Sequence, residues 1–209
     1  MWFFLLSLTF QNINAAELIS TTAGQVKNHI VTSREVELNY MIEKVLDGDE
    51  REVSAISRLD IESKSFAKEV NAVLAEWMVA LESESFSAVT VTPEEISKVM
   101  KSSLEKLDKI KAFKSLEPDE KEIKDMFERK LRAKGLTKFK SESAVVPVTD
   151  SDARTYFEQN RPKFGNLPFE NFKENIKSFL VRQQVDSRLK DWFEVLRSKY
   201  KVRNFLAEI

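Results

Sequence analysis

The chain has 209 residues, of which 42% are hydrophobic and 32% charged, with 33 Lys and Arg against 34 Asp and Glu. This composition is too apolar for a disordered chain, too charged for a protein with several membrane spans, and not basic enough to favour nucleic-acid binding. Four glycines and no cysteines argue against dinucleotide-binding and P-loop folds and exclude disulfides and zinc–thiolate sites.

An apolar run at the amino terminus predicts export. Residues 2–10 are mostly apolar, and polar residues with the small Ala15 and Ala16 follow. This pattern is typical of a signal peptide over residues 1–16, although no Lys or Arg precedes the run; the alternative is a buried helix. The run is much shorter than the ~20 residues that a membrane span needs, so we expect no stable span. Because no cysteine follows it, a lipid anchor is excluded.

A strand hairpin and a capped helix are expected next. Residues 17–31 hold apolar residues on both sides of Gly24 and predict two short strands around a turn. Thr32 with Glu35 three residues later forms a capping-box pattern, which starts a helix that should run to about Leu46. Gly48 should end this helix.

Apolar residues three and four apart predict further amphipathic helices. Thr92 followed by Pro93 is a strong helix start, Pro118 starts another helix, and Gly135 should end that one. These helices are expected over residues 61–86, 92–110 and 118–135.

The last third of the chain predicts one long helix. Thr149 caps a short helix, and a proline-rich and glycine-containing turn over residues 162–168 follows. Residues 169–199 contain no proline or glycine and should form one helix of about 45 Å. We expect this helix to be the spine on which the other helices pack. Residues 200–206 read as a closing strand that pairs with the N-terminal strands. The predicted fold class is mainly α with a small sheet that joins the two ends of the chain.

Catalytic, cofactor-binding and metal-binding residues are not predicted. His29 is the single histidine and lies in the expected hairpin turn without further ligands or a nucleophile nearby in the sequence. The acidic turn at residues 47–50 lacks the ligand spacing of a calcium loop. Acidic pairs at Glu94 and Asp119 fall in first helical turns, where they favour the helix dipole. The chain is therefore expected not to be an enzyme.

The chain has fifteen Phe, three Trp and five Met. Most of these side chains should form the core, but a surplus in a cleft would bind apolar segments of other chains. The sequence leaves both uses open.

Two segments resemble the SurA-type and PrsA-type chaperones. Residues 25–35, QVKNHIVTSRE, resemble the strand, turn and "I-T-S-x-E/D" helix start that follow the signal peptides of that family. Residues 148–164 resemble the segment "V-T-D-x-E-x-x-x-Y-F-E-x-N-x-x-K-F" that ends its N-terminal helical region. Residues 49–114 match only as a helical pattern.

In that family a parvulin isomerase domain normally follows Phe164. Here a four-residue join over 165–168 leads directly to Phe169, in a segment that resembles the family's C-terminal helix "P-F-E-x-x-K-x-x-I-x-x-x-L". Trp192 begins a match to "W-x-x-x-L-R-x-x-x-x-V". The resemblance therefore implies a single chaperone domain over 17–209, made of N-terminal helices over 17–164, the join, and a helix and strand over 169–209.

The resemblance implies a function as well. It predicts an ATP-independent periplasmic holdase that binds unfolded outer-membrane or secreted proteins in a crevice beside the long helix. A non-catalytic assembly protein with one dedicated partner is the alternative, and residual isomerase activity is not expected because the parvulin positions are missing. The sequence assigns no residues to client binding and no oligomeric state.

Overall fold

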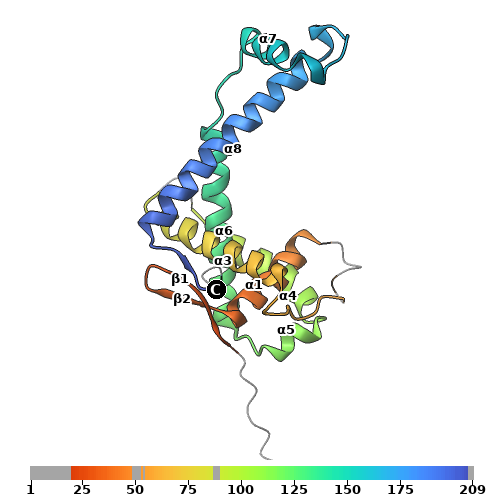
Figure 1. Cartoon of the computed structure of the whole chain (residues 1–209). Coiled ribbons are helices and arrows are strands. Elements are labelled where there is room, and N and C mark those ends of the chain that lie inside the picture. The colour runs from red at the N-terminus through yellow and green to blue at the C-terminus, as the bar shows by residue number, and fades with distance from the viewer. Residues whose placement is uncertain (1–19, 49–52, 54, 87–89, 207–209) are drawn as a thin grey trace, which may run out of the picture.

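The structure is a computed structural model that describes residues 20–48, 53, 55–86 and 90–206. The expected signal peptide over 1–16 and the acidic residues 49–50 lie outside this part. The fold is mainly α with one small sheet, as predicted, and consists of a body from which an arm projects (Figure 1).

The sheet joins the two ends of the described chain. Its central strand β1 (Thr22–Val26) pairs antiparallel with β2 (His29–Thr32) on one side and with β3 (Arg203–Asn204) on the other. The predicted pairing of N- and C-terminal strands is therefore confirmed, although β3 is shorter than the expected strand over 200–206. His29 is the first residue of β2, so the prediction that it lies in the turn was wrong.

Side-chain caps start five of the described helices. The Thr32 hydroxyl accepts from the amide of Glu35, and reciprocal capping boxes at Thr92 and Thr149 begin two later helices. The capped helices are α1 (Ser33–Asp47), α3 (Lys64–Ser83), α4 (Pro93–Leu107), α6 (Glu120–Ser143) and α7 (Asp150–Gln159). The short α5 (Lys111–Ser115) was not predicted as a separate helix.

The prediction that Gly135 ends a helix was wrong, because α6 continues through it to Ser143. A glycine inside a helix costs only about 1 kcal/mol relative to alanine. The next residue, Leu136, is fully buried, and its burial outweighs that cost. As a result α6, with 24 residues, is almost as long as the 27-residue α8 (Lys173–Lys199).

The long C-terminal helix does not act as the spine of the fold. It begins at Lys173, later than expected, because Phe169–Asn171 forms a separate 3₁₀ turn. The C-terminal part of α8 packs on the body, whereas its N-terminal part runs outward along the arm (Figure 1). Helices α3 and α6 occupy the centre of the body instead.

The body has two hydrophobic clusters that meet along α6. One lies between the sheet, α3 and the end of α8, and includes the fully buried Phe66 and Leu136. The other lies between α1, α4, α5 and α6 and includes Leu38 and Phe127. Because Phe127 and Leu136 belong to the same helix, α6 ties the two clusters together.

A third cluster lies at the end of the arm. We call residues 150–180 the distal lobe; it comprises α7, the 3₁₀ turns and the first part of α8. Its core consists of Ala153, Phe157, Phe169 and Ile176. Guanidinium groups stack on two of these rings, Arg154 on Phe169 at 4.3 Å and Arg161 on Phe157 at 4.6 Å. In a lobe too small for a large apolar core, these cation–π contacts shield the aromatic rings from water.

Ion pairs fasten α7 to α8 inside this lobe. Asp150, in the first turn of α7, pairs with Lys173 and Lys177 of α8, and the Lys177 bond measures 2.8 Å. Hydrogen bonds from Lys173 and Lys177 lower the pKa of Asp150 to about 2. The pair is exposed, so it orients the two helices more than it stabilises them.

Gly24 tests the close packing of the sheet. A Cβ at this position would lie 2.8 Å from the Arg203 carbonyl oxygen and 3.0 Å from a Leu74 methyl carbon. We expect Gly24→Ala to lower the free energy of unfolding by about 1–3 kcal/mol, measured by urea denaturation. The control Gly165→Asn should change it little, because Gly165 has φ +59° with nothing within 4 Å, and Asn tolerates this conformation. Wild-type stability of Gly24→Ala would contradict the packing described.

Phe157 tests whether the distal lobe has its own stability. Phe157→Ala should remove roughly 3–5 kcal/mol of packing from the lobe, which is more than so small a core can lose. Hydrogen exchange should then speed up in α7 while α3 keeps its protection. Phe179→Ala is the control, since Phe179 is 47% exposed and should cost much less. Equal acceleration in α7 and α3 would show that the lobe and the body unfold together.

Candidate functional site

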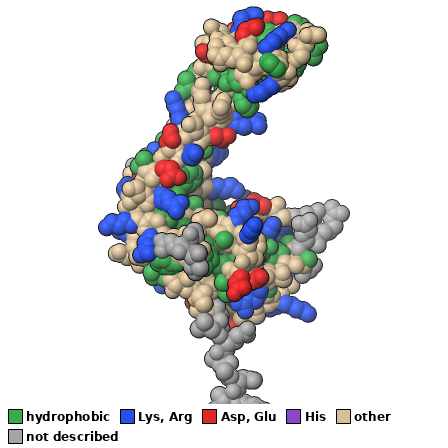
Figure 2. Space-filling model, in the orientation of Figure 1, with side chains coloured by type: hydrophobic (Ala, Val, Ile, Leu, Met, Phe, Trp, Pro, Cys, Tyr) green, Lys and Arg blue, Asp and Glu red, His purple; other side chains and the backbone are tan. Residues whose placement is uncertain are grey.

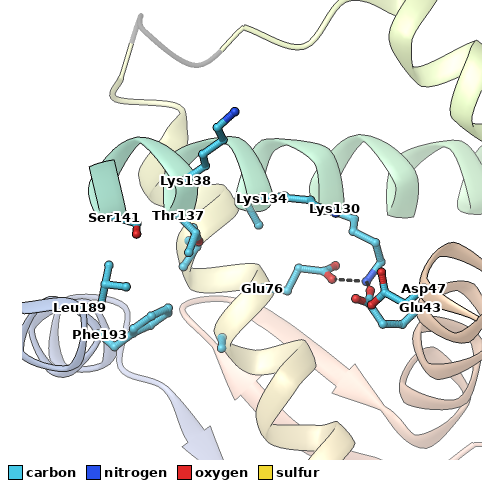
Figure 3. A pocket seen from close by; sticks show the side chains of 13 residues that line it. Glu43, Asp47, Glu76, Lys130, Lys134, Thr137, Lys138, Ser141, Leu189 and Phe193 are labelled. Atoms are coloured by element: carbon cyan, nitrogen blue, oxygen red, sulfur yellow. Dashed lines mark hydrogen bonds and ion pairs between the residues drawn. The ribbon is translucent and has the colours of Figure 1, made fainter. Parts of the chain in front are cut away.

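The main candidate site is a cleft between α3, α6 and the C-terminal half of α8, with α1 at one end (Figure 3). Its volume is about 550 Å³, enough for several side chains of another molecule. The cleft is lined by Glu43, Asp47, Ala75, Glu76, Val79, Lys130, Ala133, Lys134, Thr137, Lys138, Ser141, Leu189 and Phe193.

One end of the cleft has two apolar side chains of α8, next to the polar Thr137 and Ser141 of α6 (Figure 3). Leu189 and Phe193 lie one helical turn apart on α8 and face the cleft (Figure 3). Val79 of α3 and Ala133 of α6 also line the cleft, and both belong to the buried cluster next to the sheet. Leu189 and Phe193 are only partly covered by the protein, so they offer apolar surface to a bound chain.

The other end of the cleft is charged. The Lys130 ammonium donates to Glu43 at 2.6 Å and to Glu76 at 2.7 Å. Partial burial raises the pKa of Glu43, but the charge and hydrogen bond of Lys130 outweigh it and the pKa is lowered. Asp47 lies one turn after Glu43 on α1 and is exposed at the same end (Figure 3).

A buried ion network between α1, α3 and α6 lies next to this charged end. The Arg129 side chain is 8% exposed and donates to Glu76 at 2.7 Å and to Glu35 at 2.9 Å. Its guanidinium lies 4.3 Å from the centre of the Trp77 ring, and the Trp77 indole donates to Glu35 at 2.6 Å. Residues of α1, α3 and α6 are thus joined in one polar chain, which fixes the helices that form the cleft floor.

His29 belongs to the same network. Its Nε2 lies 2.9 Å from the Glu35 carboxylate, and its ring is 3.9 Å from that of Trp77. Through these contacts the single histidine, on β2, joins the strand to α1 and α3. Within the described ranges, no group of three or more His, Cys, Asp or Glu side chains is arranged to hold a metal ion.

Apolar side chains also appear outside the cleft. Phe139, Val145, Leu167, Phe179 and Val195 are exposed along α6, the arm and the distal lobe. On the face shown in Figure 2, hydrophobic patches on body and arm alternate with charged groups. Most of the aromatic residues that the structure describes are nevertheless at least partly buried in the three clusters.

The sequence missed the charged half of the cleft, although one signal was present. Lys130 falls three residues after the buried Phe127, where the helical period calls for an apolar side chain. A charged residue in an apolar stripe requires a partner once it is buried. The sequence did not show that Glu43 and Glu76, far away in the chain, supply it.

Comparisons with family models, curated proteins and solved structures gave no match. Among the described helices, none combines the length and the apolar character needed to cross a membrane.

Glu35 makes the network sensitive to acid. Burial raises its pKa, but hydrogen bonds from His29 and Trp77 and the charge of Arg129 lower it below the usual 4.5. A carboxyl with a lowered pKa stabilises the fold above its unfolded pKa, and this stability is lost as the pH falls through the folded pKa.

The free energy of unfolding of the wild-type protein should therefore decrease as the pH falls below about 4.5. Glu35→Gln should be less stable than the wild type at neutral pH, but its free energy of unfolding should decrease less over the same pH range. Urea denaturation from about pH 7 to about pH 3 measures both slopes. The control Glu105→Gln changes an exposed residue of α4 and should keep the wild-type slope. Equal slopes for Glu35→Gln and the wild type would contradict the role of the network.

Proposed function

We propose that this protein is an ATP-independent holdase chaperone of the SurA type, which acts in the periplasm on unfolded outer-membrane or secreted proteins. The cleft beside α8 is the proposed client site. Export would depend on the segment over residues 1–16.

The open cleft is the observation that carries this proposal. It combines partly exposed apolar side chains, Leu189 and Phe193, with polar groups on the opposite helices. Such a surface binds segments of varied sequence through many weak contacts, and each contact breaks easily. Release then needs no energy source, since a weak complex dissociates rapidly.

The sequence resemblance supports the same proposal. The segment over 148–164 that resembles the family forms α7 and the 3₁₀ turn after it. The join over 165–168 lies in the distal lobe, at the end of the arm (Figure 1). The cleft is lined instead by residues of α1, α3, α6 and the C-terminal half of α8. A chain that lacks a domain at the join therefore keeps the whole cleft.

Leu189 tests the site. The purified protein should slow the aggregation of a denatured outer-membrane protein, followed by light scattering, at near-stoichiometric ratio. Leu189→Ser should weaken client binding about fivefold or more, because the half-buried leucine contributes about 1 kcal/mol or more when a client covers it. Val195→Ser is the matched control: Val195 is on the same helix, does not line the cleft and is 63% exposed.

Three outcomes would contradict the proposal. Aggregation that continues unchanged at tenfold excess of the protein would exclude a holdase. Equal losses for Leu189→Ser and Val195→Ser would place the client site elsewhere. Capture of one stoichiometric partner, with no effect on unfolded chains, would favour a dedicated assembly protein.

A further inference from the structure

The distal lobe leaves three aromatic rings partly uncovered. The centre of the Tyr156 ring lies 5.4 Å from that of Phe179 and 6.4 Å from that of Phe164. Tyr156 and Phe164 are half-buried, whereas Phe179 is 47% exposed. We call these three side chains the distal patch. A single exposed ring is ordinary on a protein surface, but rings in contact form a continuous apolar surface that another chain can cover.

The core of the lobe uses only part of this surface. Tyr156 and Phe164 pack against the buried cluster around Phe157, whereas Phe179 lies outside that cluster and contacts the ring of Tyr156. The lobe therefore keeps Phe179 at its surface. Coverage of this side chain by another molecule is favourable, because it removes apolar surface from water.

The distal patch and the cleft lie along one face of α8, which runs from the lobe to the body (Figure 1). Phe179, Arg182, Asp186, Leu189 and Phe193 follow one another at intervals of three and four residues, which places their side chains on the same side of the helix. Leu189 and Phe193 line the cleft, and Arg182 and Asp186 are exposed. This face of α8 is therefore apolar at both ends and charged in the middle.

An unfolded polypeptide is the partner that fits this face. Ten residues separate Phe179 from Leu189, so the two apolar ends are nearly three helical turns apart. A flexible chain can place one apolar stretch on each end and leave polar residues over Arg182 and Asp186. A folded partner would need two matching apolar patches at one fixed distance. The client that the cleft is proposed to hold meets this requirement without a defined structure of its own.

We propose that the distal patch is a second client site, and that one unfolded chain binds the cleft and the distal patch together. This inference rests on the proposed chaperone function and adds a site outside the cleft. Once the cleft holds one apolar stretch, binding of the next stretch is intramolecular, and the linker between the two sets its effective concentration. Each contact stays weak, while a chain with two apolar stretches is held longer than a chain with one.

Three fluorescent peptides of equal length test the proposal with the full chain. One contains a single Phe-Leu pair in a Gly-Ser background, and the others contain two such pairs separated by two or by eight residues. Two residues are too few to span nearly three helical turns, whereas eight are enough.

Fluorescence anisotropy should show about tenfold tighter binding for the eight-residue spacing than for the single pair. This gain corresponds to an effective concentration of about 1 mM and a Kd of about 0.1 mM for the distal patch alone. The two-residue spacing should gain about twofold at most, because its second pair only doubles the number of ways to occupy the cleft.

Variants assign the gain to the distal patch. Phe179→Ala should remove the gain of the eight-residue spacing beyond that of the two-residue spacing. It should leave binding of the single-pair peptide unchanged, which also shows that the variant is folded. Val195→Ala is the matched control: Val195 is 63% exposed on the same helix but lies outside the cleft and the distal patch, so the gain should persist.

The outcomes separate this inference from the proposed function. If the two spacings bind equally well and aggregation is still suppressed, the second site is wrong and the holdase stands. If the gain persists in Phe179→Ala, or disappears in Val195→Ala as well, its assignment to the distal patch is wrong. If no peptide binds and aggregation proceeds, the proposed function fails.

Discussion

The arrangement of the body depends on a chain of charges that runs from the largely buried Glu35 through Arg129, Glu76 and Lys130 to the half-exposed Glu43. Burying such groups costs several kcal/mol per ion unless every partner is in place. These ion pairs join α1, α3 and α6, so a shift of one helix against the others would break some of them. We infer that the chain of charges contributes mainly to the relative orientation of these helices.

This constraint shapes the cleft. Glu76 and Lys130 belong both to the chain of charges and to the cleft lining. The floor of the cleft is therefore held in place by ion pairs. The opposite wall is different: Leu189 and Phe193 come from α8, which makes few contacts with α6. A fixed floor with a more independent apolar wall suits a surface that accepts segments of different shape.

The sequence predicted most helix starts because they depend on local chemistry. Thr32, Thr92 and Thr149 each satisfy backbone amides within three residues, and such caps need no tertiary contact. Errors arose where distant residues decide. Gly135 looked like a helix end, but burial of Leu136 carries α6 past it, and Lys130 gave no hint of Glu43 or Glu76 as its partners. The long helix was taken as the centre because its periodicity did not show which parts of it are covered.

The continuity of α8 fixes a distance on the surface of the molecule. Leu189 in the cleft and the exposed Phe179 of the distal lobe belong to one uninterrupted helix. Ten residues at 1.5 Å each separate them by about 15 Å along the axis. An extended polypeptide covers that distance with about five residues. A shorter apolar segment therefore reaches only one of the two side chains, and a longer one can contact both at once.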